Sequence, residues 1–237
     1  EPSLLALCRA EKRLEKLKQL LIYLVDSSIF ETMEIIKFED WERKEIFRLF
    51  EGSRLPFYFV AFDVDVTEVY QYAHSGHKSF YHTMIWLVTK AACSVRNFRY
   101  RVKGDKIVLL NGLVPSFTVM LPGEELFRIV NCPMEDELDA FLEKAGQKCR
   151  EQRSFLSEED SEDLIFLSCV PWFATTAISN EHDTNPEDYF TRISWGMFVE
   201  REGRKVLNVT VDVNHRVIDG IHIARFRDEL VRLIGTL

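Results

Sequence analysis

The fold of this chain is decided by a stretch near its end, Val211-Asp212-Val213-Asn214-His215-Arg216-Val217-Ile218-Asp219-Gly220. Its first residues alternate as a strand does, and His215 stands where that strand ends. Asp219 and Gly220 then form a turn into a helix predicted from Ile221 to Leu233. This arrangement holds an imidazole at a fixed angle. Taken alone, a His-x-x-x-Asp pair more often marks a buried, hydrogen-bonded histidine than a catalytic one.

The composition is that of a packed protein. The chain has 237 residues, of which 46% are hydrophobic and 12% aromatic, so intrinsic disorder is not expected. A net charge of −8 argues against sequence-independent binding of nucleic acid, which needs a basic surface. No apolar run has the length of a membrane span, and no signal peptide is recognised, although a chain that starts at Glu1 leaves room for a missing leader.

The cysteines indicate a reducing compartment. The chain has 5 of them, an odd number without paired spacing, so neither a disulfide framework nor a zinc site is predicted. They are Cys8, Cys93, Cys132, Cys149 and Cys169. We therefore expect a cytoplasmic protein.

Two regions can be distinguished along the chain. Residues 1–33 form an N-terminal helical extension, because leucines recur at three- and four-residue intervals between 4 and 25. This helix either binds a partner or another copy, or packs on its own domain. Residues 34–237 form one domain. Its predicted strands are 34–38, 56–64, 98–103, 106–110, 115–121, 165–170, 193–200 and 205–214, and its predicted helices are 40–50, 68–75, 80–96, 134–151 and 221–233.

The connections between these elements predict a mixed sheet. Lys103-Gly104-Asp105 and Glu202-Gly203 are typical of hairpin turns, whereas other strands are joined through helices. A combination of hairpins and crossovers favours an α/β two-layer sandwich with helices packed on a mixed sheet, and not a doubly wound parallel sheet.

His215 is the best candidate for a chemical role among the 6 histidines. His74 and His77 have a spacing that metal ligands use, but no third ligand lies near them in the sequence, so no metal site is predicted. The chain has no phosphate-binding glycine motif and no serine-hydrolase elbow. A histidine base without a paired nucleophile indicates a reaction in which the substrate itself is the nucleophile.

Three segments in order resemble the chloramphenicol acetyltransferases. Asn214–Gly220 resembles their His-His-x-x-x-Asp-Gly motif, Trp41–Phe47 their Trp-x-Arg-x-Glu-x-Phe opening, and Ser168–Trp172 their Ser-x-x-Pro-Trp segment. The histidine motif is locally closer to Asp-His-Arg-Val-Ile-Asp-Gly of the dihydrolipoyl acyltransferase cores, which share the fold. The lipoyl modules and flexible linkers of those enzymes are absent here.

The resemblance implies the coenzyme A-dependent acyltransferase fold and a homotrimer with active sites between subunits. Acetyl-CoA and a small hydroxyl acceptor, chloramphenicol or another alcohol, would be the substrates, without a metal. His215 would be the general base. Ser168 would donate to the oxyanion, and Ser194 would steady the intermediate through water.

The resemblance also implies supporting and substrate-binding residues. Asp219 would be structural and would pair with Arg43. Leu49, Phe50 and Met120 stand at substrate-wall positions, where the family has aromatic residues. Asn214 replaces the first histidine of the motif. Met197 replaces a lysine of the family's Gly-Lys-Tyr segment, which weakens one expected contact to coenzyme A phosphates.

Two alternatives remain open at the level of sequence. One is acyl transfer from lipoyl groups or to thiols. The other is a non-catalytic relative that binds a small ligand or a partner.

Overall fold

The computed structural model describes residues 33–157, 161–182 and 185–237. The helix predicted within residues 4–25 lies outside the described residues, as does the rest of the extension up to residue 32.

The centre of the fold is a mixed seven-stranded sheet. Six strands follow the order β2-β10-β8-β7-β5-β6, and β9 pairs with β10 outside this path. β7 runs parallel to β5 and β8, while the other pairs are antiparallel. The predicted mixed sheet is thereby confirmed. Its strands are β2 (Phe57–Asp65), β5 (Val114–Val119), β6 (Arg128–Asn131), β7 (Leu164–Cys169), β8 (Arg192–Trp195), β9 (Val199–Arg201) and β10 (Arg204–Asn214).

A second, three-stranded sheet stands beside the first, where the sequence predicted only one. It consists of β1 (Glu34–Lys37), β4 (Lys106–Leu109) and β3 (Tyr100–Lys103), paired in the order β1-β4-β3. The hairpin between β3 and β4 turns at Gly104, whose φ of 59° favours glycine. These strands pair with one another, and pairing is decided by long-range contacts that the local pattern does not contain.

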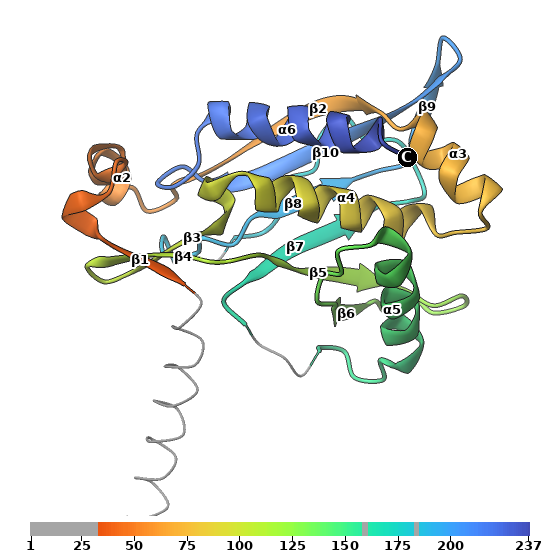
Figure 1. Cartoon of the computed structure of the whole chain (residues 1–237), viewed down its shortest axis with the longest axis horizontal. Coiled ribbons are helices and arrows are strands. Elements are labelled where there is room, and N and C mark those ends of the chain that lie inside the picture. The colour runs from red at the N-terminus through yellow and green to blue at the C-terminus, as the bar shows by residue number, and fades with distance from the viewer. Residues whose placement is uncertain (1–32, 158–160, 183–184) are drawn as a thin grey trace, which may run out of the picture.

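Helices cover one face of the large sheet. Figure 1 shows α4 and α6 side by side across it, with α5 beside β5 and β6 and with α2 near the small sheet. α4 is apolar nearly all round and eight of its residues are buried, because it lies between α6, α5 and α3. The helices are α2 (Lys44–Glu51), α3 (Thr67–Ser75), α4 (Phe80–Ser94), α5 (Leu138–Glu151) and α6 (Gly220–Ile234), with short 3-10 turns η1 (Phe38–Asp40) and η2 (Arg96–Arg99).

The other face of the large sheet, here called the open face, carries polar side chains. Strand residues alternate between the two faces. Val211, Ile193 and Leu167 are buried in the core cluster, and they pair across the three central strands. Their neighbours on the open face include hydroxyl residues. Side chains of β10 hold the backbone of Ile178, Asn180 and Pro186 against this face.

Some predicted element boundaries were wrong, and one strand was missed. Residues 98–99 belong to η2, because the chain leaves α4 through a 3-10 turn before β3 begins. The predicted helix 134–151 starts only at Leu138. β6 (Arg128–Asn131) was not predicted, because its place as the edge strand beside β5 depends on pairing across the fold.

The strand predicted at 193–200 is two strands. β8 ends at Trp195 and β9 begins at Val199. Between them the N–H of Met197 donates to the carbonyl of Phe173 at 2.9 Å, so this residue leaves the ladder with β10. Gly196 permits the approach, since a Cβ there would lie 2.8 Å from the Phe173 oxygen.

Candidate active site

The His215 imidazole lies between two aromatic rings. The ring of Phe50, near the end of α2, stacks on it with centroids 4.3 Å apart and planes at 27°. Tyr58 of β2 contacts it at 4.3 Å and 44°. The side chain retains 36% of its exposure, so the imidazole is held between these rings but open to a ligand.

The turn that carries His215 is fixed by its neighbours. The His215 N–H donates to the Pro56 carbonyl at 2.7 Å. The Asn214 side chain donates to the carbonyls of Pro186 and Asp188, and its Oδ1 accepts from the Arg216 N–H. Asn214, which departs from the family motif, therefore ties the turn to the backbone of Pro186 and Asp188.

Arg43 and Asp219 form a short ion pair beneath this turn. Arg43 Nη1 lies 2.6 Å from Asp219 Oδ2, and the arginine side chain is only 6% exposed. His215 Nε2 is farther from the same carboxylate, 3.4 Å from Oδ1. The hydrogen bond from Arg43 is the main cause that lowers the pKa of Asp219, so this carboxyl stays ionised at neutral pH.

Asp219 is also the N-cap of α6. Its side chain accepts from the backbone of His222, and its own N–H donates to His222 Nδ1 at 2.8 Å, which completes a capping box. Burial, with help from the Arg43 charge, lowers the pKa of His222 to about 4. His222 is therefore neutral at pH 7, as an acceptor nitrogen must be.

Two residues near His215 were not predicted from the sequence. Tyr58 donates to the Ile218 carbonyl at 3.3 Å, and burial raises its pKa to about 12. The buried Arg216 donates to the carbonyls of Phe50 and Glu51, which lie where α2 ends. A cation is favourable at the C-terminus of a helix, so Arg216 keeps Phe50 against His215. In the sequence, the only indication of a role for Arg216 was its position directly after His215.

Ser168 and Ser194 lie side by side in the middle of the open face. Ser168 of β7 pairs in register with Ser194 of β8, and Ser194 pairs with Thr210 of β10. Ser194 donates to Asn180 Oδ1 at 3.0 Å. The two predicted serines are thus neighbours in space although 26 residues separate them along the chain.

Within one chain, these serines do not meet His215. Thr210 is level with Ser194, and His215 follows five residues later on the same strand and turn. At a rise of about 3.3 Å per residue, this places the histidine roughly 15 Å from the two hydroxyls. The predicted catalytic residues therefore form two half-sites at separate places on the molecule.

The predicted substrate-wall residues divide between the half-sites. Phe50 belongs to the His215 half, and Leu49 beside it is 75% exposed. Met120 directly follows β5, which is parallel to β7 and next to it, so it belongs to the serine half. Met120 is also exposed. Both halves therefore present apolar side chains to the outside.

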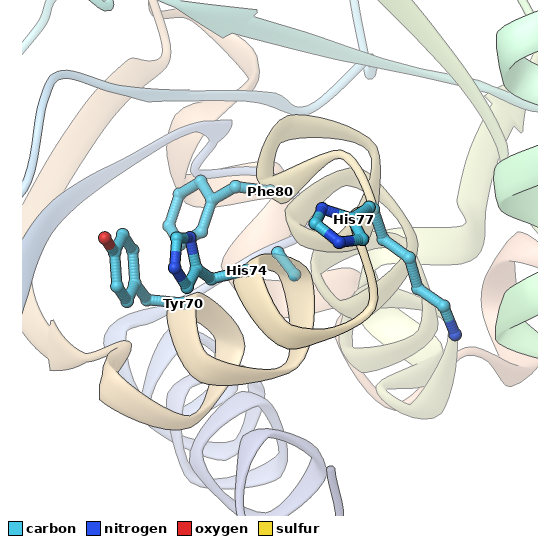
Figure 2. Close-up of a pocket in the computed structure, with 6 residues that line it drawn as sticks. Tyr70, His74, His77 and Phe80 are labelled. Atoms are coloured by element: carbon cyan, nitrogen blue, oxygen red, sulfur yellow. The ribbon is translucent and has the colours of Figure 1, made fainter.

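A surface pocket lies at the opposite end of β10 from His215. Figure 2 shows Tyr70, His74, His77 and Phe80 around it, and Ala73 and Lys78 complete the lining. The ring of Phe198 contacts Tyr70 and Phe80 from the side of β9. His74 lies in the last turn of α3, within the helix predicted over 68–75, and its ring stacks on Tyr70.

A chloramphenicol acetyltransferase family model matches residues 31–231, which is most of the chain. This chain belongs to the chloramphenicol acetyltransferase family. Chloramphenicol acetyltransferase 3 of Escherichia coli is 29% identical over 212 residues, covering 86% of this chain and 99% of the relative. Chloramphenicol acetyltransferase 2 of Escherichia coli is 29% identical over 203 residues, covering 82% and 93%. The predicted family is confirmed, and with it membership among acyltransferases.

Solved structures bear out the fold. A chloramphenicol acetyltransferase superposes with a TM-score of 0.77 at 23% identity, covering 85% of this chain and 99% of that one. A probable dihydrolipoamide acetyltransferase from Listeria monocytogenes 4b F2365 superposes with a TM-score of 0.62 at 14% identity, covering 81% and 89%. The acetyltransferase family and the lipoamide enzymes therefore share this architecture, as the histidine motif indicated.

The described residues contain neither a cluster of metal-ligating side chains nor a membrane-spanning helix. Outside the gaps at 1–32, 158–160 and 183–184, no group of three or more His, Cys, Asp or Glu side chains is arranged to hold a metal ion. In the same part of the chain, no helix has the length and apolar character needed to cross a membrane.

Proposed function

We propose that this protein transfers the acetyl group of acetyl-CoA to a hydroxyl of a small acceptor, with chloramphenicol as the first candidate. The observation that supports this most directly is the held imidazole of His215, partly exposed above the Arg43–Asp219 pair, in a chain of the chloramphenicol acetyltransferase family. Two relatives that this chain matches over nearly their whole length are named for that activity.

In the proposed reaction, His215 removes the proton of the acceptor hydroxyl. The oxygen attacks the acetyl carbonyl carbon of acetyl-CoA, and a tetrahedral oxyanion forms. Ser168 donates to this oxyanion. When the intermediate collapses, the carbon–sulfur bond breaks, and the imidazolium returns its proton to the coenzyme A thiolate. Both substrates are bound at once, and no acyl-enzyme forms. General-base assistance of this kind is worth roughly 10²–10⁴ in rate.

Asp219 is proposed to aim the histidine and not to act as its acid partner. Its closest charged contact is Arg43 at 2.6 Å, whereas His215 Nε2 is 3.4 Å away. A carboxylate committed to an arginine and to a helix cap holds the turn between β10 and α6 in one conformation.

A homotrimer would unite the two half-sites. His215 of one copy would face Ser168 and Ser194 of the next. The same head-to-tail contact would occur three times and close the ring of three copies. The separation of the half-sites within one chain and the exposed side chains Leu49 and Met120 support this arrangement. The acceptor would bind between the copies, with Phe50 and Leu49 on one wall and Met120 on the other.

The nucleotide end of acetyl-CoA is proposed to use the pocket of Figure 2. Phe198 follows Met197, which stands where the family has a lysine that contacts coenzyme A phosphates. Its ring packs against Tyr70 and Phe80 of the pocket, so the segment and the pocket form one surface. Aromatic rings suit an adenine, and Lys78 and the two histidines suit phosphates.

The same proposal includes the domain boundaries and the cellular compartment. Residues 34–237 would form the acyltransferase domain, with residues 1–33 as a helical extension. Cys93, Cys132, Cys149 and Cys169 are free thiols, which supports the expected reducing cytoplasm.

The direct test is an acceptor screen that follows release of the coenzyme A thiol, beginning with chloramphenicol. The wild-type protein should release thiol with at least one hydroxyl compound, and the His215→Ala variant should be slower by a factor of about 10² or more. An equally fast His215→Ala variant would refute the proposed base. Dihydrolipoamide in the same screen tests the alternative of thiol acylation. A non-catalytic relative would give no product with any acceptor.

A further inference from the structure

A chain of polar contacts crosses the open face from His182 to Ser194. His182 Nε2 donates to Asp212 Oδ1 at 2.8 Å, and the Asp212 side chain is only 3% exposed. The other oxygen of Asp212 accepts from the Asn180 N–H at 3.4 Å. The side-chain oxygen of Asn180 then accepts from the Ser194 hydroxyl at 3.0 Å. Three hydrogen bonds thus connect His182 to Ser194.

His182 is fixed from both sides. Its ring stacks on Phe57 of β2 with centroids 4.0 Å apart and planes at 9°. Its Nδ1 is buried without a hydrogen-bond partner, and the nearest carboxylate oxygen, of Asp188, lies 3.9 Å away. Arg192 holds Asp188 at 2.7 Å. The imidazole can therefore neither turn nor leave without exposing the buried Asp212 carboxylate.

This series of hydrogen bonds determines whether Ser194 donates or accepts toward a bound ligand. A serine hydroxyl has one proton, and here it points at Asn180, so the Ser194 oxygen offers only lone pairs to anything bound on the open face. We propose that His182 is a positioning residue: through Asp212 and Asn180 it keeps Ser194 as a hydrogen-bond acceptor for a donor at the reacting acetyl group. A water molecule that donates one proton to Ser194 and one to the oxyanion fits this acceptor. This inference rests on the proposed function, which places Ser194 in the active site.

The kinetic test uses His182→Leu, Ser194→Ala and the double variant. His182→Leu should lower kcat by about the same factor as Ser194→Ala, on the order of 10- to 100-fold, with KM for acetyl-CoA unchanged. The double variant should be no slower than either single one, because both remove the same contact. His182→Gln, whose amide can still donate to Asp212, should recover most of the activity. Additive losses would overturn the proposal.

Two further variants distinguish positioning of Ser194 from simple anchoring of residues 178–182 against the sheet. Thr210→Val removes the hydroxyl that accepts from the Ile178 N–H, so it loosens the same segment without touching the chain of contacts. Its kcat should change little, and a loss as large as that of His182→Leu would contradict the proposal. If His182→Leu does not fold, Asp212→Asn interrupts the same series of contacts, because its single side-chain oxygen can accept from only one of the two donors, His182 and Asn180.

Crystal structures of the wild type and of His182→Leu give a readout that does not depend on activity. The Ser194 hydroxyl should bond Asn180 in the wild type and turn away in the variant. An unchanged contact would overturn the positioning role even if the enzyme acetylates its acceptor. A wild type without acetyl transfer would instead refute the proposed function, and the comparison of the two structures would still decide what His182 does.

Discussion

At the scale of single residues, Arg43 is the charge on which the His215 turn depends. Its side chain is 6% exposed and Asp219 is 27% exposed, so the pair is screened much less than a surface pair. Arg43→Ala should lower the free energy of unfolding by about 3 kcal/mol, because the Asp219 carboxylate loses its partner. Urea unfolding followed by circular dichroism measures this.

Arg48 of α2, five residues after Arg43, provides the matched control. Its ion pairs with Glu39 and Glu45 are exposed, with 42% exposure for Arg48 itself. Arg48→Ala should cost less than about 1 kcal/mol. Equal losses for Arg43→Ala and Arg48→Ala would show that burial of the Arg43–Asp219 pair contributes nothing.

Tyr58 acts on His215 through its ring and not through its hydroxyl. The ring contacts the imidazole at 4.3 Å, whereas the hydroxyl makes one long bond of 3.3 Å to Ile218. Tyr58→Phe should leave kcat nearly unchanged. Tyr58→Ala should lower kcat by roughly tenfold, because the imidazole gains freedom on that side. Steady-state kinetics on both variants distinguishes the two contributions, and an inactive Tyr58→Phe would assign the role to the hydroxyl.

At the scale of elements, the start of α6 makes stability depend on pH. His222 titrates at about pH 4 in the folded protein and near 6.5 when unfolded. Because the folded value is the lower one, the unfolded chain binds more protons between these values, and stability falls as the pH decreases from 6.5 towards 4. This single group should contribute a loss of about 2 kcal/mol between pH 7 and pH 4.5.

His222→Gln isolates that contribution. Glutamine is an ordinary partner in a capping box, so the variant keeps the bond to the Asp219 N–H but cannot titrate. Its unfolding free energy should fall less steeply with acid than that of the wild type. Urea unfolding at pH 7, 5.5 and 4.5 tests this. Parallel curves for the two proteins would show that His222 is not the group responsible.

The pocket between α3 and α4 should govern the affinity for acetyl-CoA. Tyr70 contacts Phe198 and stacks on His74, so its ring forms the centre of the lining. Tyr70→Ala should raise KM for acetyl-CoA by about fivefold and leave kcat and KM for the acceptor nearly unchanged, since loss of one aromatic contact removes roughly 1 kcal/mol of binding free energy. A fall in kcat alone would argue that the nucleotide binds elsewhere.

At the scale of the whole molecule, much of the architecture could be predicted from the sequence. The alternation in β10, the hairpin turns and the apolar α4 are local patterns, and each gave the correct element. The second sheet, β6 and the break after Trp195 were missed, because pairing partners and the Met197–Phe173 bond depend on contacts across the fold.

The candidate site shows the same limit more strongly. His215 stood out at a strand end, but its pairing with Ser168, Ser194 and Arg43 was suggested only by the family resemblance. Tyr58 lies 157 residues before His215 in the chain. No helix or strand was predicted around His182, and its bond to Asp212 joins residues 30 positions apart that no local pattern connects. Long-range contacts of this kind become visible only in the folded chain.

The central claim is that His215 of one copy works with Ser168 of another. The most direct measurement is a complementation assay, in which His215→Ala and Ser168→Ala chains are co-expressed in equal amounts and the purified mixture is assayed for acetyl transfer. Each variant alone should be nearly inactive. In mixed trimers, about a quarter of the interfaces combine an intact His215 with an intact Ser168, so activity should return to about a quarter of wild type. A mixture no more active than the separate variants would contradict the shared site.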